Sequence, residues 1–276
     1  MKPLLLALAL GLVIQAPLRA QDPVEIIKQS VAHDEENFAH LKDYTYQEIQ
    51  EVRTLDKNGK DTIRNAQTNE ILVLSGRPYS RRIAKDGKPL SEKDARKEQE
   101  KMDKESEKRL KETSKDRAKF EKERREEREF ENELPAAYNF KLVGQETING
   151  RSAWRMFAEP KPGYKPRVKD AEILKKVRAT VWVDTATYQF MKAEMEVVDT
   201  ISWGLFVFRI PPGAKISFEQ IRVNDEVWLP REVHVRGEAK LAIFKTFRLA
   251  VDVSYKDYRK FQSDSQVVDA EEVGVQ

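Results

Sequence analysis

The sequence predicts an α+β protein: an antiparallel, open half-barrel of β-strands with an N-terminal helix on its concave side and a long, charged helical insertion. Three observations predict this fold. An amphipathic segment with helical spacing comes first, a long series of alternating segments joined by short turns follows, and one highly charged segment interrupts that series. Because so many consecutive antiparallel strands must curl to bury their apolar face, a curved sheet is expected.

Residues 1–20 predict a secretory signal peptide. Lys2 gives a positive start, residues 4–14 form an apolar run, and the small Ala20 precedes polar residues. This run of about eleven residues is shorter than the roughly twenty that a membrane-spanning helix needs, although an uncleaved anchor remains the alternative. We therefore expect residues 21–276 to form a single domain in the periplasm. The chain has no cysteine, so it forms no disulfides and must rely on its own core.

The first helix is predicted to begin at Asp22. Asp22 suits the N-cap, Pro23 suits the first helical position, and Glu25 completes a capping box. The apolar residues that follow recur at helical spacing and predict a stripe that packs on the sheet. They are Val24, Ile27, Val31, Phe38 and Leu41.

Strands are predicted wherever the apolar period changes to two or an apolar run is bounded by turn residues. The Asn149-Gly150 pair between two of them is a strong hairpin signal. Consecutive strands with short turns favour an antiparallel meander. The predicted strands are 44–55, 62–74, 79–84, 138–146, 151–158, 177–183, 188–198, 203–210, 214–223, 226–235 and 241–255.

The helical insertion is predicted over residues 91–134. About seven residues in ten are charged, and acidic and basic residues recur three and four apart. Ser91 and Asp94 suit an N-terminal cap. The apolar residues are too sparse for a coiled coil, which favours a solvated helix or pair of helices. A lid or docking arm over a binding site is the functional alternative.

The residues give no sign of an enzyme. Nucleophile elbows, phosphate-binding loops and zinc-protease motifs are missing from the sequence, and thiol catalysis is excluded because there is no cysteine. His33 and His40 lie about two helical turns apart, too far to share a metal ion. We expect no catalytic residue, no metal and no cofactor, although paired carboxylates of a hydrolase stay open as an alternative. The net charge of +3 comes from interleaved charges of both signs, which argues against a nucleic-acid partner.

Aromatic residues gather in the C-terminal strands. Phe206 and Phe208 alternate with Leu205 and Val207, so this segment is apolar on both faces, as in a strand that is buried on both sides. One side is then available for a ligand cavity, and ordinary core packing is the alternative. The candidate ligand-binding residues are Trp203, Phe206, Phe208, Phe218 and Trp228.

Three segments resemble the LolA-like superfamily, which includes outer-membrane lipoprotein carriers and RseB-like proteins. They are the hairpin at 145–154, the block 181–185 with 192–194, and the segment 223–230 with its Trp-Leu-Pro ending. The resemblance covers about residues 22–261 apart from the insertion, and no ligand residue of the family transfers to this chain.

The resemblance implies an unclosed barrel with a helical lid over an apolar cavity. The function that it implies is a periplasmic, non-enzymatic carrier or sensor that binds a lipid or the acyl group of a lipoprotein. Contact with the membrane would be peripheral at most. The alternative is an envelope module that binds a protein partner through the charged helix 91–134.

Overall fold

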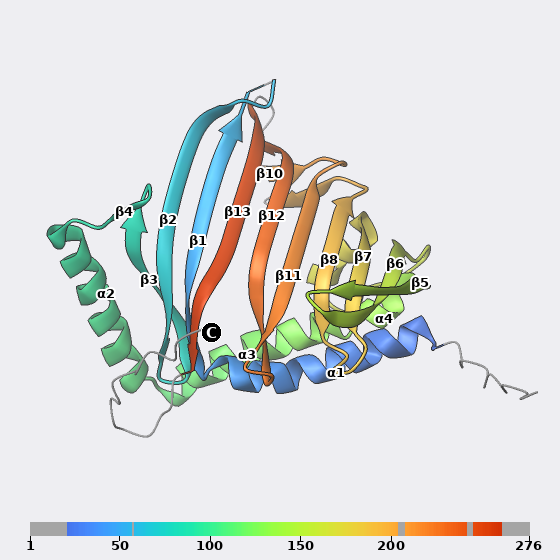
Figure 1. Ribbon diagram of the computed structural model, residues 1–276, viewed down its shortest axis with the longest axis horizontal. Helices are drawn as coiled ribbons and strands as arrows, with labels where there is room; N and C mark the ends of the chain where they lie inside the picture. Colours follow the sequence, from blue (N-terminus) through green and yellow to red (C-terminus); the bar gives the residue numbers. More distant parts are fainter. Residues whose placement is uncertain (1–20, 57, 204–207, 242–244, 261–276) are drawn as a thin grey trace, which may run out of the picture.

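The computed structural model describes residues 21–56, 58–203, 208–241 and 245–260. Residues 1–20, the predicted signal peptide, lie outside these ranges. In the described part, 13 strands form one curved antiparallel sheet (Figure 1). The first four strands are β1 (Tyr44–Leu55), β2 (Asp61–Leu74), β3 (Arg77–Lys85) and β4 (Lys88–Pro89). The middle strands are β5 (Tyr138–Ile148), β6 (Arg151–Pro160), β7 (Val177–Asp184) and β8 (Phe190–Val197). The last strands are β9 (Ile201–Trp203), β10 (Phe208–Ile210), β11 (Lys215–Val223), β12 (Val227–Leu241) and β13 (Lys245–Lys260).

The strand order differs from a simple meander. The sheet runs β4-β3-β2-β1-β13-β12-β11-β8-β7-β6-β5, so the first strands join the last one through the β1–β13 pair. That pair extends from Tyr44 opposite Lys260 to Leu55 opposite Arg248. β4 and β5 end the order and do not pair with each other, so the sheet stays open. The predicted α+β half-barrel is confirmed.

One predicted strand is wrong in detail. Residues 203–210 do not form a single strand: β9 and β10 pair antiparallel with each other, Trp203 opposite Phe208. β10 also pairs with the end of β12. The sequence misled because an apolar run predicts burial, and burial alone does not separate one strand from two short ones.

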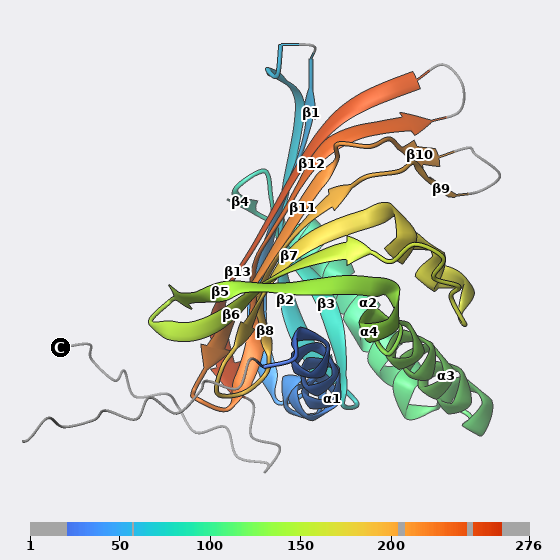
Figure 2. The ribbon, with the colours of Figure 1, turned by 90° about the vertical axis from the view of Figure 1, so that its right-hand side faces the viewer.

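Helix α1 (Pro23–Leu41) lies across the concave face of the sheet (Figure 2). The Asp22 side chain accepts a hydrogen bond from the Val24 amide at 2.9 Å, which confirms Asp22 as the N-cap. The predicted capping box is wrong, because the Glu25 side chain accepts from Gln29 instead. The helix buries Ile26, Ile27 and also the polar Asn37. It therefore packs on the sheet along a stripe that is less apolar than its sequence predicts.

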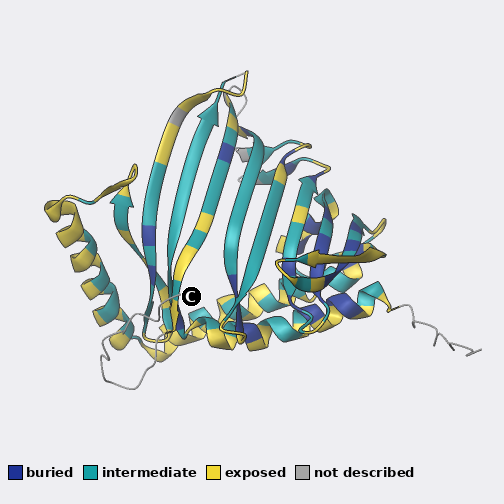
Figure 3. Ribbon diagram, in the orientation of Figure 1, coloured by how far each residue is buried: buried dark blue, intermediate teal, exposed yellow. Residues whose placement is uncertain are grey.

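The insertion consists of two long helices, α2 (Glu92–Leu110) and α3 (Ser114–Glu131), and a short one, α4 (Leu134–Ala137). The break is sharp because Thr113 caps α3 in a capping box with Asp116. Neither α2 nor α3 contains a buried residue, and exposed residues follow α2 along its length (Figure 3). The insertion is thus a pair of solvated helices, one of the two forms that its composition predicts.

Several contacts fix the insertion to the body of the protein, and one from each long helix illustrates them. The guanidinium of Arg109 in α2 donates hydrogen bonds to the backbone carbonyls of Leu74, Arg77 and Pro78 at 2.9, 3.0 and 3.2 Å. In α3, Arg124 stacks 3.4 Å from the centre of the Phe38 ring. α2 is therefore held to the β2–β3 turn, and α3 lies alongside α1 (Figure 2).

The largest apolar cluster lies where α1, α4 and the 3-10 helix η1 (Lys169–Lys176) cover the concave side of β5–β8. The convex side carries a smaller cluster of Ala153, Trp182 and Met191 from β6–β8 with Trp228 from β12. Within the described ranges, no helix combines the length and the apolarity that crossing a membrane would require.

Candidate functional site

An apolar cavity of about 470 Å³ opens into the largest cluster. Its floor comes from alternate residues of three neighbouring strands, because side chains two apart on a strand share one face. On the central strand of the three, β8, Met195 lies between Ala179 of β7 and Ile216 of β11. Two residues earlier on β8, Ala193 lies between Val181 of β7 and Phe218 of β11. The floor is therefore a continuous surface of cross-strand pairs.

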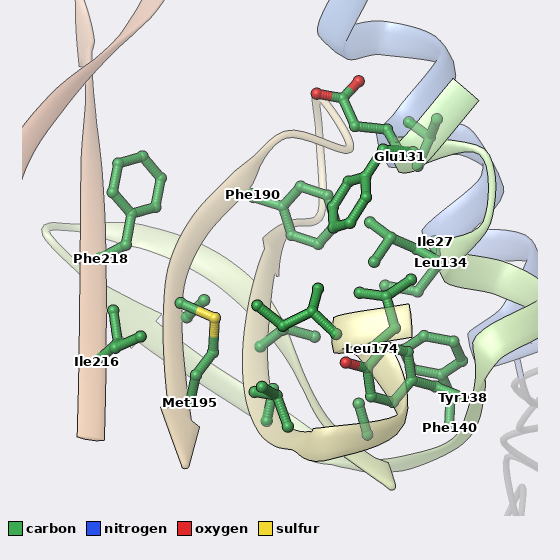
Figure 4. A pocket seen from close by; sticks show the side chains of 18 of the residues that line it. Ile27, Glu131, Leu134, Tyr138, Phe140, Leu174, Phe190, Met195, Ile216 and Phe218 are labelled. Atoms are coloured by element: carbon green, nitrogen blue, oxygen red, sulfur yellow. The ribbon is translucent and has the colours of Figure 1, made fainter. Parts of the chain in front are cut away.

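Helices form the walls of the cavity. Ile27 and Val31 enter from α1, Phe130 and Leu134 from the junction of α3 and α4, and Leu174 from η1. Figure 4 shows Ile27, Leu134 and Leu174 facing the strand residues Met195, Ile216 and Phe218. Because α3 and α4 belong to the insertion, the charged helices do more than extend into solvent: their end closes part of the cavity.

The described lining is apolar apart from Asp34, Glu131, Gln220 and the hydroxyl of Tyr138. Burial raises the pKa of Tyr138 well above its usual value, so this phenol is neutral at physiological pH. A concave apolar surface with a few polar groups, of a volume between roughly 300 and 1,000 Å³, is typical of a small-molecule site.

Two carboxylates lie at the α3 end of the cavity, where Figure 4 places Glu131 on the far side from Tyr138 and Phe140. Burial raises the pKa of Glu131 to about 7, the neighbouring Asp34 adds to this rise, and Arg124 opposes it. Burial likewise raises the pKa of Asp34, against the attraction of Arg124. The polar end of the cavity is therefore acidic and partly desolvated.

The structure brings one predicted ligand residue into the cavity. Phe218 lines its floor. Trp228 does not: it is 3 % exposed and packs on the convex side with Ala153, Trp182 and Met191. Phe206 lies outside the described residues, and Trp203 and Phe208 are described only as backbone members of β9 and β10.

Most cavity residues come from elements that the aromatic pattern did not point to. The alternation of 177–183 places Ala179 and Val181 correctly on one face. In 191–197, strict alternation would put Met191 on the same face as Ala193 and Met195, whereas the structure turns Met191 to the convex cluster. The cause is a bulge: Trp182 pairs with Lys192 but Val183 pairs with Phe190, which leaves Met191 as the extra residue.

A serine, a histidine and an aspartate stand in register on the convex face. Ser217, His234 and Asp252 occupy paired positions on β11, β12 and β13. The Nδ1 atom of His234 lies 2.6 Å from Asp252, but its Nε2 atom lies 3.3 Å from Glu232 and not against Ser217. The hydrogen bond to Asp252 raises the pKa of His234, which favours the protonated ring. The ring does not form the serine–histidine pair that nucleophilic catalysis requires.

The described residues contain no group of three or more acidic or histidine side chains arranged to hold a metal ion. No protein-family model and no curated protein sequence matches the chain.

Several solved structures match over most of their length. One is a DUF1329 family protein from Desulfovibrio piger, with 14 % identity, 90 % of this chain and 96 % of that chain covered, and a TM-score of 0.33. Another is a putative outer membrane lipoprotein-sorting protein domain from Vibrio parahaemolyticus, with 11 % identity, coverage of 87 % and 95 %, and a TM-score of 0.30. A LolA superfamily protein from Nitrosomonas europaea shows 8 % identity, coverage of 86 % and 92 %, and a TM-score of 0.31.

These neighbours carry the names of the group that the sequence resembles. Their TM-scores are too low to transfer a function, so the role of the cavity must come from its own residues.

Proposed function

We propose that this chain is a periplasmic, non-enzymatic binding protein that carries or senses a lipid or the acyl group of a lipoprotein. The observation that supports this role is the cavity of about 470 Å³ with its apolar floor and walls. Burial of each methylene group contributes about 0.8 kcal/mol, so a chain of about ten methylenes gains about 8 kcal/mol before the costs of association. The costs of association reduce this gain, so a chain of this length alone should bind more weakly than the micromolar affinity that about 8 kcal/mol would give.

The arrangement of the insertion also suits a binding role. α3 and α4 contribute Phe130 and Leu134 to the cavity, while α3 itself buries no residue. Phe130 and Leu134 are only partly buried where they pack against the core, so movement of α3 would open the cavity at a smaller cost than movement of α1, which buries Ile26 and Ile27. Such a lid lets an apolar ligand enter and leave, as a carrier or a sensor needs.

The proposal is tested by fluorescence titration with N-phenyl-1-naphthylamine, a neutral apolar dye that brightens when it leaves water. Phe218→Asp places a carboxylate on the cavity floor, and Ser217→Asp places the same group one residue away on the opposite face of β11. We expect the first variant to lose dye binding by at least about tenfold, since burying an unpaired charge costs more than 1.4 kcal/mol. The second variant should bind like the wild type.

Unchanged binding by Phe218→Asp, with circular dichroism showing a folded protein, would overturn the proposal. Native mass spectrometry of the protein purified from the periplasm gives a second reading. A stoichiometric lipid or acylated peptide supports the carrier or sensor role and identifies the ligand class.

A further inference from the structure

A second hollow adjoins the apolar cavity and has the opposite character. It has a volume of about 660 Å³ and lies between α3 and residues 168–170. Phe130 and Glu131 line both hollows, so the cavity and this groove adjoin at these two residues. A ligand that filled the cavity and continued past Phe130 would enter the groove.

The groove is acidic. Its described lining contains six carboxylate side chains and a single basic one, Lys169. The acidic residues are Glu123, Glu126, Glu127, Glu129, Glu131 and Asp170. Five of the six come from the C-terminal half of α3, the end that carries the negative end of the helix dipole. The cavity itself has two carboxylates and no basic residue in its described lining.

Basic residues near the groove are engaged along the helices. The pairs Lys119–Glu123, Lys122–Glu126 and Arg125–Glu129 join residues four apart at 3.8, 3.5 and 3.9 Å. Such exposed pairs contribute only a few tenths of a kcal/mol and leave carboxylate lone pairs free for another donor. A ligand cation can therefore compete for these carboxylates.

Two further basic side chains of α3 are engaged with residues outside the groove lining or with a glutamate of the helix itself. Arg124 stacks on Phe38 and donates to Glu127, and Arg128 of α3 donates to Glu35 of α1 at 3.4 Å. Neither guanidinium lines the cavity or the groove. An anionic head group at this end would thus meet carboxylates first.

We propose that the ligand is an amphiphile whose apolar chain fills the cavity and whose head group carries protonated amines that lie in the acidic groove, as in a lipopeptide with a basic peptide part. This inference rests on the proposed function, since it names the class of ligand for the same cavity. It separates the expected ligand from fatty acids and other anionic lipids.

Glu131 couples binding to pH because it lies where chain and head group meet. Its carboxyl has a pKa of about 7 in the free protein, and it faces Asp34 and Glu35 from α1 and Arg124 and Glu127 from α3. A bound ammonium group favours the ionised carboxylate, so binding below pH 7 must release a proton. Affinity for the amine should rise by up to about thirtyfold from pH 5.5 to pH 8 and level off above that.

The test compares three N-lauroyl dipeptide amides, made with two lysines, two serines or two glutamates, by isothermal titration calorimetry. The neutral serine probe reports on the apolar cavity alone and so on the proposed function. We expect the lysine probe to bind at least about tenfold more tightly than the serine probe at pH 8, and the glutamate probe to bind more weakly than either. Added salt should screen the attraction between the lysine head group and the carboxylates. It should therefore lower the affinity of the lysine probe more than that of the serine probe.

Glu131→Gln should remove most of the pH dependence for the lysine probe, so that the ratio of its affinities at pH 8 and pH 5.5 falls toward the ratio that the serine probe shows. Glu121→Gln, an exposed glutamate on α3 outside the groove lining, is the matched control and should bind like the wild type. A dilysine amide that carries an acetyl group in place of the lauroyl chain should bind at least about tenfold more weakly than the lauroyl dilysine probe.

Equal affinity for all three lauroyl probes would overturn the inference and leave the apolar-cavity role intact. Equal binding of the acetylated and lauroylated dilysines would also overturn it, because the groove would then attract any cation independently of the cavity. Failure of all three lauroyl probes would overturn the proposed function together with the inference.

Discussion

Replacement of Asn37 by alanine should detach α1 from the sheet. Asn37 is 7 % exposed, its side-chain amide donates to the Trp228 carbonyl at 2.9 Å, and its side-chain oxygen accepts from the Trp228 amide at 2.7 Å. The variant loses both bonds and leaves a buried backbone donor and acceptor without partners. Each such group costs about 1–3 kcal/mol, and water that enters the space offsets part of this, so we expect a loss of about 2–4 kcal/mol.

The assay is urea unfolding followed by circular dichroism, with thermal unfolding beside it. A loss of this size lowers the melting temperature of a chain this long by roughly 5–15 °C. Asn65→Ala removes the same side chain at an exposed position on β2 and should change the unfolding free energy by less than about 0.5 kcal/mol. An equally small change for Asn37→Ala would refute the reasoning, because the two hydrogen bonds would then carry no net energy.

Three further changes test other contacts. Arg109→Ala removes the three bonds to backbone carbonyls that hold α2, and should speed hydrogen exchange and trypsin cleavage in α2 with little effect on the sheet. Asp252→Asn tests how the stability of the fold depends on pH. Burial raises the pKa of Asp252, but hydrogen bonds from His234, Arg236 and Arg53 lower it from 3.8 to about 2, so the stability that it contributes exists above pH 4 and disappears between pH 4 and 2. The variant should lose no more than about 2 kcal/mol of unfolding free energy at pH 7. In unfolding curves recorded at lower pH, the difference in unfolding free energy between variant and wild type should shrink as the pH falls to 2. Ala193→Leu fills part of the cavity floor, and should raise the urea midpoint slightly while it weakens N-phenyl-1-naphthylamine binding at least about tenfold.

Local signals in the sequence predicted local structure well. Asp22 caps α1 as its position before Pro23 indicates, and the Asn149-Gly150 pair forms the β5–β6 hairpin with both residues at positive φ. The charged composition of 91–134 predicted exposed helices, and α2 and α3 bury nothing. Each of these features depends on residues within a few positions of one another.

Non-local features were beyond prediction from one sequence. The β1–β13 pair joins segments about 200 residues apart, and no turn residue specifies it. The bulge at Met191 reverses the face of one side chain because of how β8 pairs with β7, which its own alternation does not reveal. The sequence gives no sign that Asn37 is buried, because a polar residue in an amphipathic helix predicts exposure. Its hydrogen-bond partner is the backbone of Trp228, 191 residues away.

The same distinction explains why the site was only partly predicted. Phe218 was a candidate because it is aromatic, but the floor of the cavity depends as much on the small side chains Ala179 and Ala193. Small residues leave the space that a ligand occupies, and larger ones there would pack the core more tightly. A protein without disulfides depends on the packing of its core for stability. The alanines that face the cavity beside the largest apolar cluster fit the proposed role, in which a ligand would supply the missing contacts when it binds.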